Sequence, residues 1–184
     1  MKATEILKEE HRVIERVLAS LDKGTLRLEK NEPINSDFFI ETCDFIKGFA
    51  DGCHHKKEEQ VLFKTLIANG MPAENSPVAV MLAEHDEGRT YTRLICEATN
   101  RLKSDDETAI DTIVENARRY TALLRQHIMK EDQILFPMAD RIIPLSLHDQ
   151  VLDDFEKVEH EETGAGVHEK YLALAETLES QVTN

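Results

Sequence analysis

The pattern of apolar and polar positions along the chain is helical almost throughout. Apolar residues recur at intervals of three and four, and the period-two alternation of a strand is absent. Four long amphipathic stretches are separated by short breaks, which predicts an all-α fold, an up-down-up-down four-helix bundle. The predicted helices start at Thr4 as N-cap, at Asn35 or Ser36, at Ser76-Pro77, and after Ser104-Asp105-Asp106.

A second, smaller part is expected to follow the bundle. Residues 1–140 should form the bundle, with Pro137 ending or kinking its last helix. Residues 141–184 are predicted to be a C-terminal helical extension packed on it. Within this extension Gly164-Ala165-Gly166 separates two helical stretches. One hypothesis is that this break is a hinge over the mouth of a site in the bundle.

Each of the four apolar stripes contains a histidine at a core-facing position. Two of these stripes also carry a glutamate one turn later, on the same face of the helix. Burying a carboxylate without a partner costs several kcal/mol, on the order of the charged-group penalties known for protein interiors. A single buried histidine is usually structural, but a set from four helices favours one shared cluster of divalent metals. The residues are His11, His54, Glu58, His85, His127 and Glu131.

The second and fourth helices carry two copies of one motif. HHKKEEQVLF at 54–63 and HIMKEDQILF at 127–136 lie 73 residues apart and share His, Lys, Glu, Gln, Leu and Phe. Two carboxylates from different helices could bridge a pair of metals, and six or seven candidates are too many for one tetrahedral zinc. The Glu-x-x-His motif of ferritin-like proteins is absent, because no histidine has a glutamate three residues before it. Imidazole and carboxylate donors suit iron, manganese or zinc.

These residues make the chain resemble the hemerythrin-like family, also called HHE cation-binding domains. The resemblance is carried by His11, the two motif copies and EHDEGR at 84–89, and it covers roughly residues 1–140. It implies a four-helix bundle that holds two iron ions without haem, bridged by carboxylate or oxo groups. The family's usual ligands are five histidines and two carboxylates. Carried over by position, six of them are the residues named above, with one histidine still to be assigned.

The third helix departs from the pattern of the oxygen-carrying hemerythrins. Those proteins have His-x-x-x-His there, whereas this chain has Arg89 four residues after His85. Hemerythrin-like domains of the iron-sensing type instead use the residue after the second-helix histidine, which here is His55. We therefore expect His55 to be the fifth histidine ligand, the alternative being a rim histidine at the surface. Glu84 and Arg89 are expected at the surface or behind the ligands.

The fourth helix offers two carboxylates. Oxygen carriers use His-x-x-x-x-Asp, a spacing that Asp132 satisfies from His127. The internal repeat and the apolar stripe favour Glu131, which leaves Asp132 and Glu59 as outer groups. Tyr120, two turns before His127, is either a core aromatic residue or a hydrogen-bond donor to a ligand on the metal.

Several other polar residues fall outside the motif. The three cysteines have no metal or redox spacing and are expected to be buried, reduced thiols. The tail histidines lie near four glutamates, which predicts either a solvated charged face or a second metal site. These residues are Cys43, Cys53 and Cys96, then His148, His160 and His168, with Glu159, Glu161, Glu162 and Glu169.

Composition narrows the class of function. Hydrophobic residues make up 41% and charged residues 32%, as in soluble globular proteins. A net charge of -14 argues against nucleic acid and anionic membranes as partners. No stretch resembles a membrane span or a signal peptide, so a cytoplasmic location is expected.

Three functions fit the expected site. The first is binding of dioxygen or a related small ligand, for storage, delivery or sensing. The second is an enzyme that reduces peroxide or nitric oxide, which would need an external reductant because no flavin or iron–sulfur motif is present. The third is an iron-responsive or iron-donating module.

Overall fold

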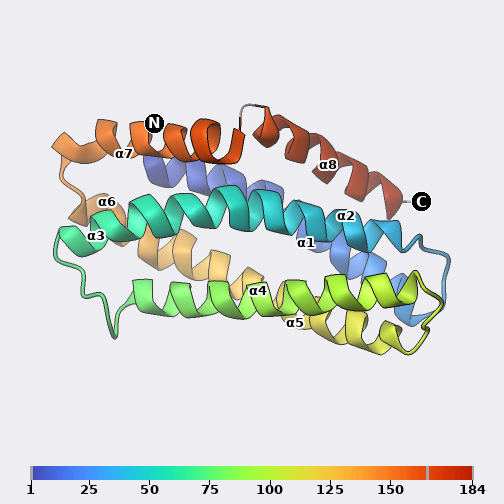
Figure 1. Cartoon of the computed structure of the whole chain (residues 1–184). Coiled ribbons are helices and arrows are strands. Elements are labelled where there is room, and N and C mark those ends of the chain that lie inside the picture. The colour runs from blue at the N-terminus through green and yellow to red at the C-terminus, as the bar shows by residue number, and fades with distance from the viewer. Residues whose placement is uncertain (1, 165, 184) are drawn as a thin grey trace.

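The computed structural model describes residues 2–164 and 166–183, and all regular structure in these ranges is helical, as predicted. Four long helical runs lie side by side (Figure 1). The first is α1 (Ala3–Glu29) and the third is α4 (Pro77–Leu102). The second joins α2 (Asp37–Phe45), the π-helical segments η1 (Ile46–His55) and η2 (Glu58–Leu62), and α3 (Phe63–Ala68). The fourth joins α5 (Ala109–Lys130), the π-helical η3 (Glu131–Leu135) and α6 (Phe136–Ile142).

The C-terminal segments lie along one side of this bundle (Figure 1). They are a 3₁₀ turn η4 (Leu145–Leu147), α7 (His148–Lys157), η5 (Val158–Gly164) and α8 (Val167–Gln181), and they contact the first and second helical runs. The close approach of α8 depends on Gly48, because a Cβ atom there would collide with the Tyr171 hydroxyl. The hinge hypothesis for residues 164–166 rests partly on Ala165, which lies outside the described residues. In the described ranges no helix is both long and apolar enough to cross a bilayer.

The buried apolar residues form two clusters at different levels of the bundle. Helix α8 joins one cluster through Tyr171, Ala175 and Leu178, and α7 joins the other through Val151 and Phe155. On α1, Leu7 belongs to one cluster and Ile14 to the other, and His11 lies between them. The other three helical runs repeat this order, so a polar layer separates the two apolar clusters.

The helix starts follow the sequence to different degrees. The Ser76 hydroxyl accepts a hydrogen bond from the Ala79 N–H at 3.3 Å, as an N-cap should. Before α2 it is Asn35, not Ser36, whose side chain accepts the Asp37 N–H, at 2.9 Å. The prediction of Thr4 as N-cap is wrong, because α1 begins at Ala3 and its N-cap residue is Lys2.

The Thr4 hydroxyl has a different role, in which it ties α1 to α6. It donates to Asp140 at 2.8 Å, and Lys2 pairs with the same carboxylate at 2.9 Å. Partial burial raises the pKa of Asp140, but the hydrogen bonds and the Lys2 charge outweigh burial and hold it below its ordinary value. Asp140 therefore stabilises this end of the bundle in its ionised form.

The expectation of three reduced cysteines is wrong for two of them. Cys43 on α2 and Cys96 on α4 form a disulfide across 53 residues of chain. Both are buried, so the bond crosslinks the second and third helical runs inside the apolar cluster. Cys53 is a free, buried thiol, and burial raises its pKa to about 11.

Candidate metal centre

Seven polar side chains fill the layer between the two apolar clusters. All are at most 6% exposed, and they come from all four helical runs. They form two groups, in each of which one donor atom per residue lies within 4.8 Å of all the others. One group is His11, His54, Glu58 and Glu131, and the other is His55, Glu58, His85 and His127.

The inward-facing atoms of this layer have no ordinary hydrogen-bond partners. Both carboxylate oxygens of Glu58 and of Glu131 are buried and unpartnered, as are the Nε2 atoms of His11 and His54. Burial raises the pKa of Glu58 well above its ordinary value, and the charge of Glu131 raises it further. Two buried carboxylates beside unpartnered imidazole nitrogens are the donor set that a cation requires.

The imidazole lone pairs also converge. The Nε2 atoms of His85 and His127 lie 3.1 Å apart. The Nδ1 atom of His85 faces Glu59 at 2.7 Å, and that of His127 faces Glu84 at 2.9 Å. Because a carboxylate accepts hydrogen bonds, these contacts place the ring protons on Nδ1 and leave both Nε2 lone pairs pointing inward. Both Nε2 atoms are thus placed to coordinate one cation between them.

Each of the five histidines in this layer faces a carboxylate on its outer side. Each of these carboxylates in turn pairs with a lysine or an arginine. Hydrogen bonds between ring and carboxylate fix the tautomer and orientation of rings that bind a metal, and four of the five rings make one, the exception being His55, which lies 3.5 Å from Asp51. The His54 ring, for example, contacts Glu10 at 2.8 Å, and Glu10 accepts a hydrogen bond from buried Lys57 at 2.6 Å. The five sets are His11–Asp132–Arg12, His54–Glu10–Lys57, His55–Asp51–Arg89, His85–Glu59–Arg89 and His127–Glu84–Lys130.

The internal repeat of the sequence is also a repeat of contacts. Glu59 of the first copy binds His85, and Asp132 of the second copy binds His11. The closing phenylalanines behave alike: Phe63 stacks on His85 with ring centroids 5.9 Å apart, and Phe136 on His11 at 5.4 Å. The contacts made by the first and second helical runs are therefore repeated by the third and fourth. In the structure Asp132 and Glu59 lie in the outer positions that the sequence predicted.

Each motif copy is wound as a π-helix directly after its lysine. The Phe63 N–H donates to the carbonyl of Glu58, five residues earlier, and the Phe136 N–H does the same to Glu131. Such wide turns are frequent at functional sites. They also account for Pro137, which follows the second wide turn at a position where its missing N–H is not required. Pro137 does not end the helix, because α6 continues to Ile142.

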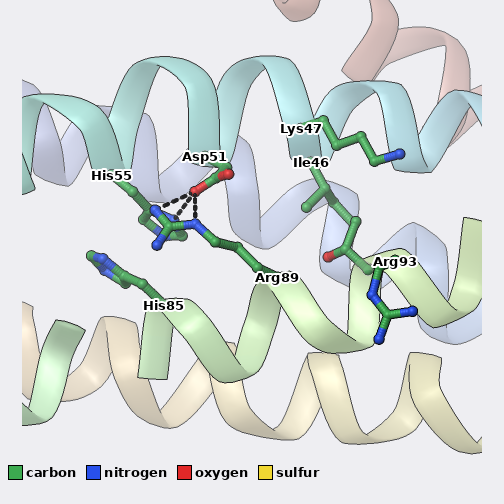
Figure 2. Close-up of a pocket in the computed structure, with 8 residues that line it drawn as sticks. Ile46, Lys47, Asp51, His55, His85, Arg89 and Arg93 are labelled. Atoms are coloured by element: carbon green, nitrogen blue, oxygen red, sulfur yellow. Dashed lines mark hydrogen bonds and ion pairs between the residues drawn. The ribbon is translucent and has the colours of Figure 1, made fainter. Parts of the chain in front are cut away.

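The fifth histidine is inside the site and not on its rim. His55 is buried, and its ring stacks on that of His85 with centroids 3.9 Å apart. A pocket of about 330 Å³ reaches both rings from the surface. Figure 2 shows Arg89 extending from α4 to Asp51 beside these rings. Arg89 thus lies behind the histidines, as expected.

Tyr120 and the tail residues lie outside this layer. The Tyr120 hydroxyl is buried and has no hydrogen-bond partner among the described residues, and a Cβ at Gly88 would be 3.6 Å from its ring. His168 forms a third cluster of possible metal ligands with Glu10 and Glu159. Lys57 already neutralises both of these carboxylates. His160 is exposed, and the side chains of Glu161 and Glu162 lie outside the described part of the chain.

Of the outer carboxylates on α1 and α4, the sequence offered Glu84 as a group behind the ligands, and the structure places it there, whereas Glu10 was not predicted. Glu10 and Glu84 each precede the histidine of their own helix but bind the histidine of the next helical run. The shared dipeptide Glu-His in both helices was the available signal.

A buried layer of imidazoles and carboxylates from four helical runs defines a metal-binding helical bundle. Residues 2–139 match the family model of the hemerythrin HHE cation-binding domain. The chain belongs to this family, as the resemblance predicted.

The chain is also similar to individual proteins. Uncharacterized protein Rv1995 of Mycobacterium tuberculosis and Mb2018 of Mycobacterium bovis are each 26% identical over 162 residues, 88% of this chain and 63% of theirs. Iron-sulfur cluster repair protein YtfE of Escherichia coli is 35% identical over 89 residues, 47% of this chain and 40% of its own. The chain therefore spans less than two thirds of the length of these relatives. No solved structure matches it.

Proposed function

We propose that this centre binds two iron ions and that one of them takes up dioxygen or a related small ligand. His11 and His54 would hold one ion, and His55, His85 and His127 the other. Seven nitrogen and carboxylate donors exceed the needs of one tetrahedral zinc and fit a pair of ions with mixed ligation. Metal binding as such follows from the family, while the number and identity of the ions are our proposal.

The position of the two glutamates carries this proposal. Glu58 directs Oε1 toward His54 at 3.5 Å and Oε2 toward His85 at 3.5 Å. The Oε2 atom of Glu131 lies 3.2 Å from the Nε2 atoms of both His11 and His127. Each carboxylate thus faces one histidine of either group, as a group that bridges two ions would.

The difference between the two groups supports binding of an external ligand. The two-histidine group offers one imidazole fewer than the three-histidine group, so its ion would have room for another donor. In the internal repeat, the counterpart of His55 is Ile128, a buried apolar residue. Apolar surroundings exclude water and proton donors, which favours binding over turnover. A pair of iron ions would supply the two electrons that dioxygen needs for reversible binding.

The test is a spectroscopic oxygen titration. Protein loaded anaerobically with iron should develop a visible absorption band on addition of oxygen and lose it when oxygen is removed. The band should return through repeated cycles. A band that decays irreversibly, or catalytic loss of added peroxide, would refute the binding function and favour the enzyme, which would require an external reductant.

A second candidate is iron donation. The similarity to YtfE, whose name describes iron–sulfur cluster repair, supports this alternative over the motif region. An iron donor should pass its metal rapidly to an apo iron–sulfur protein in an anaerobic transfer assay. Retention of both ions in the presence of the acceptor would rule out donation.

A further inference from the structure

Three neighbouring positions break the internal symmetry of the site. His55, Asp51 and Arg89 belong to the half of the site that is formed by His55, Glu58, His85, His127 and the groups behind them. Their counterparts in the repeat are Ile128, Leu124 and Glu15, of which the first two are buried apolar residues. Every other histidine, inner glutamate and outer carboxylate has an equivalent in the other half. The three residues that differ therefore convert one half of a symmetric site into a three-histidine half.

Arg89 contacts both carboxylates behind the stacked rings. Its Nε atom donates to Asp51 at 2.8 Å, and its Nη2 atom donates to Glu59 at 2.7 Å. Asp51 lies 3.5 Å from Nδ1 of His55, and Glu59 lies 2.7 Å from Nδ1 of His85. One guanidinium group is therefore connected to two stacked imidazoles (Figure 2).

We propose that Arg89 is the positioning residue of the three-histidine half. Its planar fork holds two carboxylates at once, which a lysine ammonium on a flexible stem does less well. Glu59 in turn orients the His85 ring through a hydrogen bond, and Asp51 faces the His55 ring that stacks on it, at 3.5 Å and without a hydrogen bond. This inference rests on the proposed binding of two iron ions, because it assigns Arg89 to one ion of the pair.

The place of Arg89 adds a second consequence. The pocket of about 330 Å³ is lined by Arg89 together with Asp51, His55 and His85. A shortened side chain at position 89 would open the pocket toward the two rings. Loss of Arg89 should therefore loosen the rings and admit water or a chelator on the same side.

Arg93 provides a matched control. It lies one turn further along α4 and lines the same pocket, but among the described residues its ion pair is with the exposed Glu97, at 3.1 Å. In Figure 2 it points away from His55 and His85. An Arg93→Ala variant removes an equal charge and a similar volume without touching the carboxylates behind the ligands.

The experiment measures how fast each of the two ions leaves. Wild type, Arg89→Ala, Arg89→Lys and Arg93→Ala are loaded with ⁵⁷Fe, challenged with a strong iron chelator and followed by Mössbauer spectroscopy, which separates two inequivalent irons. In Arg89→Ala one iron should be lost roughly 10- to 100-fold faster, the range known for removal of groups behind metal ligands, while the other is unchanged. Arg89→Lys should be intermediate, and Arg93→Ala should behave as wild type. Asp51→Asn should accelerate loss of the same iron and serves if Arg89→Ala does not fold.

The outcomes separate the two proposals. A wild type that holds fewer than two irons would overturn the proposed function and this inference with it. Two irons in wild type, with Arg89→Ala releasing them as slowly as Arg93→Ala, would overturn the role of Arg89 alone. Equal acceleration of both irons would also overturn it, because that result indicates a general loosening of the bundle.

Discussion

Replacing Lys57 by methionine tests the outer charge network where it is most buried. The Lys57 side chain is 1% exposed, and its Nζ atom lies 2.6 Å from Glu10 and 2.5 Å from Glu159. Methionine keeps most of the apolar stem, so the change removes mainly the charge. Of the hydrogen bonds that Glu10 makes with described residues, the one with His54 would then remain. Removing one partner of a buried ion pair typically destabilises by about 3–5 kcal/mol.

The lower end of that range applies here. The Glu159 side chain is 25% exposed, so water can solvate this carboxylate when the ammonium is gone. We expect a loss of about 3 kcal/mol in the free energy of unfolding of the metal-free protein. With an m-value near 3 kcal/mol/M, the urea midpoint would fall by about 1 M.

The assay is equilibrium unfolding in urea, followed by circular dichroism at neutral pH. Lys103→Met is the control, because Lys103 pairs with Asp37 at 2.5 Å on the surface, and exposed pairs contribute little. Its midpoint should stay close to that of wild type. If Lys57→Met unfolds at the same urea concentration as this control, the buried network does not stabilise the fold and the reasoning fails.

Three further predictions concern other parts of the chain. In the oxidised protein, alkylation after unfolding should label one cysteine, and reduction should expose two more. Three labels without reduction would disprove the Cys43–Cys96 bond. Loss of this bond should lower the free energy of unfolding by about 4 kcal/mol for a loop of this length. Tyr120→Phe should stabilise the metal-free protein by up to about 1 kcal/mol, since it removes an unpartnered buried hydroxyl; clear destabilisation in thermal melts would show that the hydroxyl has a partner. Because the folded-state pKa of Asp140 is lowered, its ionised form adds stability above the unfolded pKa of about 4, and this is lost as pH falls through the lower folded pKa. The difference in unfolding free energy between wild type and Asp140→Asn should therefore be constant above about pH 5 and shrink in acid, and a difference that does not change with pH would contradict it.

The polar layer could be predicted from the sequence because the periodicity of apolar residues in each helix indicates which of its faces is buried. A histidine on an apolar stripe, and a glutamate one turn later, can be recognised from their spacing in the sequence alone. The same holds for the start of α4, where Ser76 and Pro77 carry the signal within the helix itself.

Contacts between helical runs could not be predicted in this way. Glu10 binds His54 and Glu84 binds His127 across helix interfaces, so their roles depend on how the helices are rotated against each other. The Cys43–Cys96 bond could not be predicted for the same reason, since the sequence around each cysteine does not indicate its partner. The π-helical turns were missed because a regular helix had been assumed at both motifs. The segments η2 and η3 span five residues each, too short a stretch to alter the hydrophobic pattern.

The most direct test of the central claim is the number of iron ions per chain in wild type and in Glu58→Ala. Glu58 belongs to both groups of donors, whereas the exposed His160 belongs to neither. Metal analysis after anaerobic loading with ferrous iron should give two irons per chain in wild type and in the control His160→Ala. Glu58→Ala should bind neither ion tightly. Fewer than two irons in wild type, zinc in their place, or two irons in Glu58→Ala would contradict a di-iron centre built on bridging carboxylates.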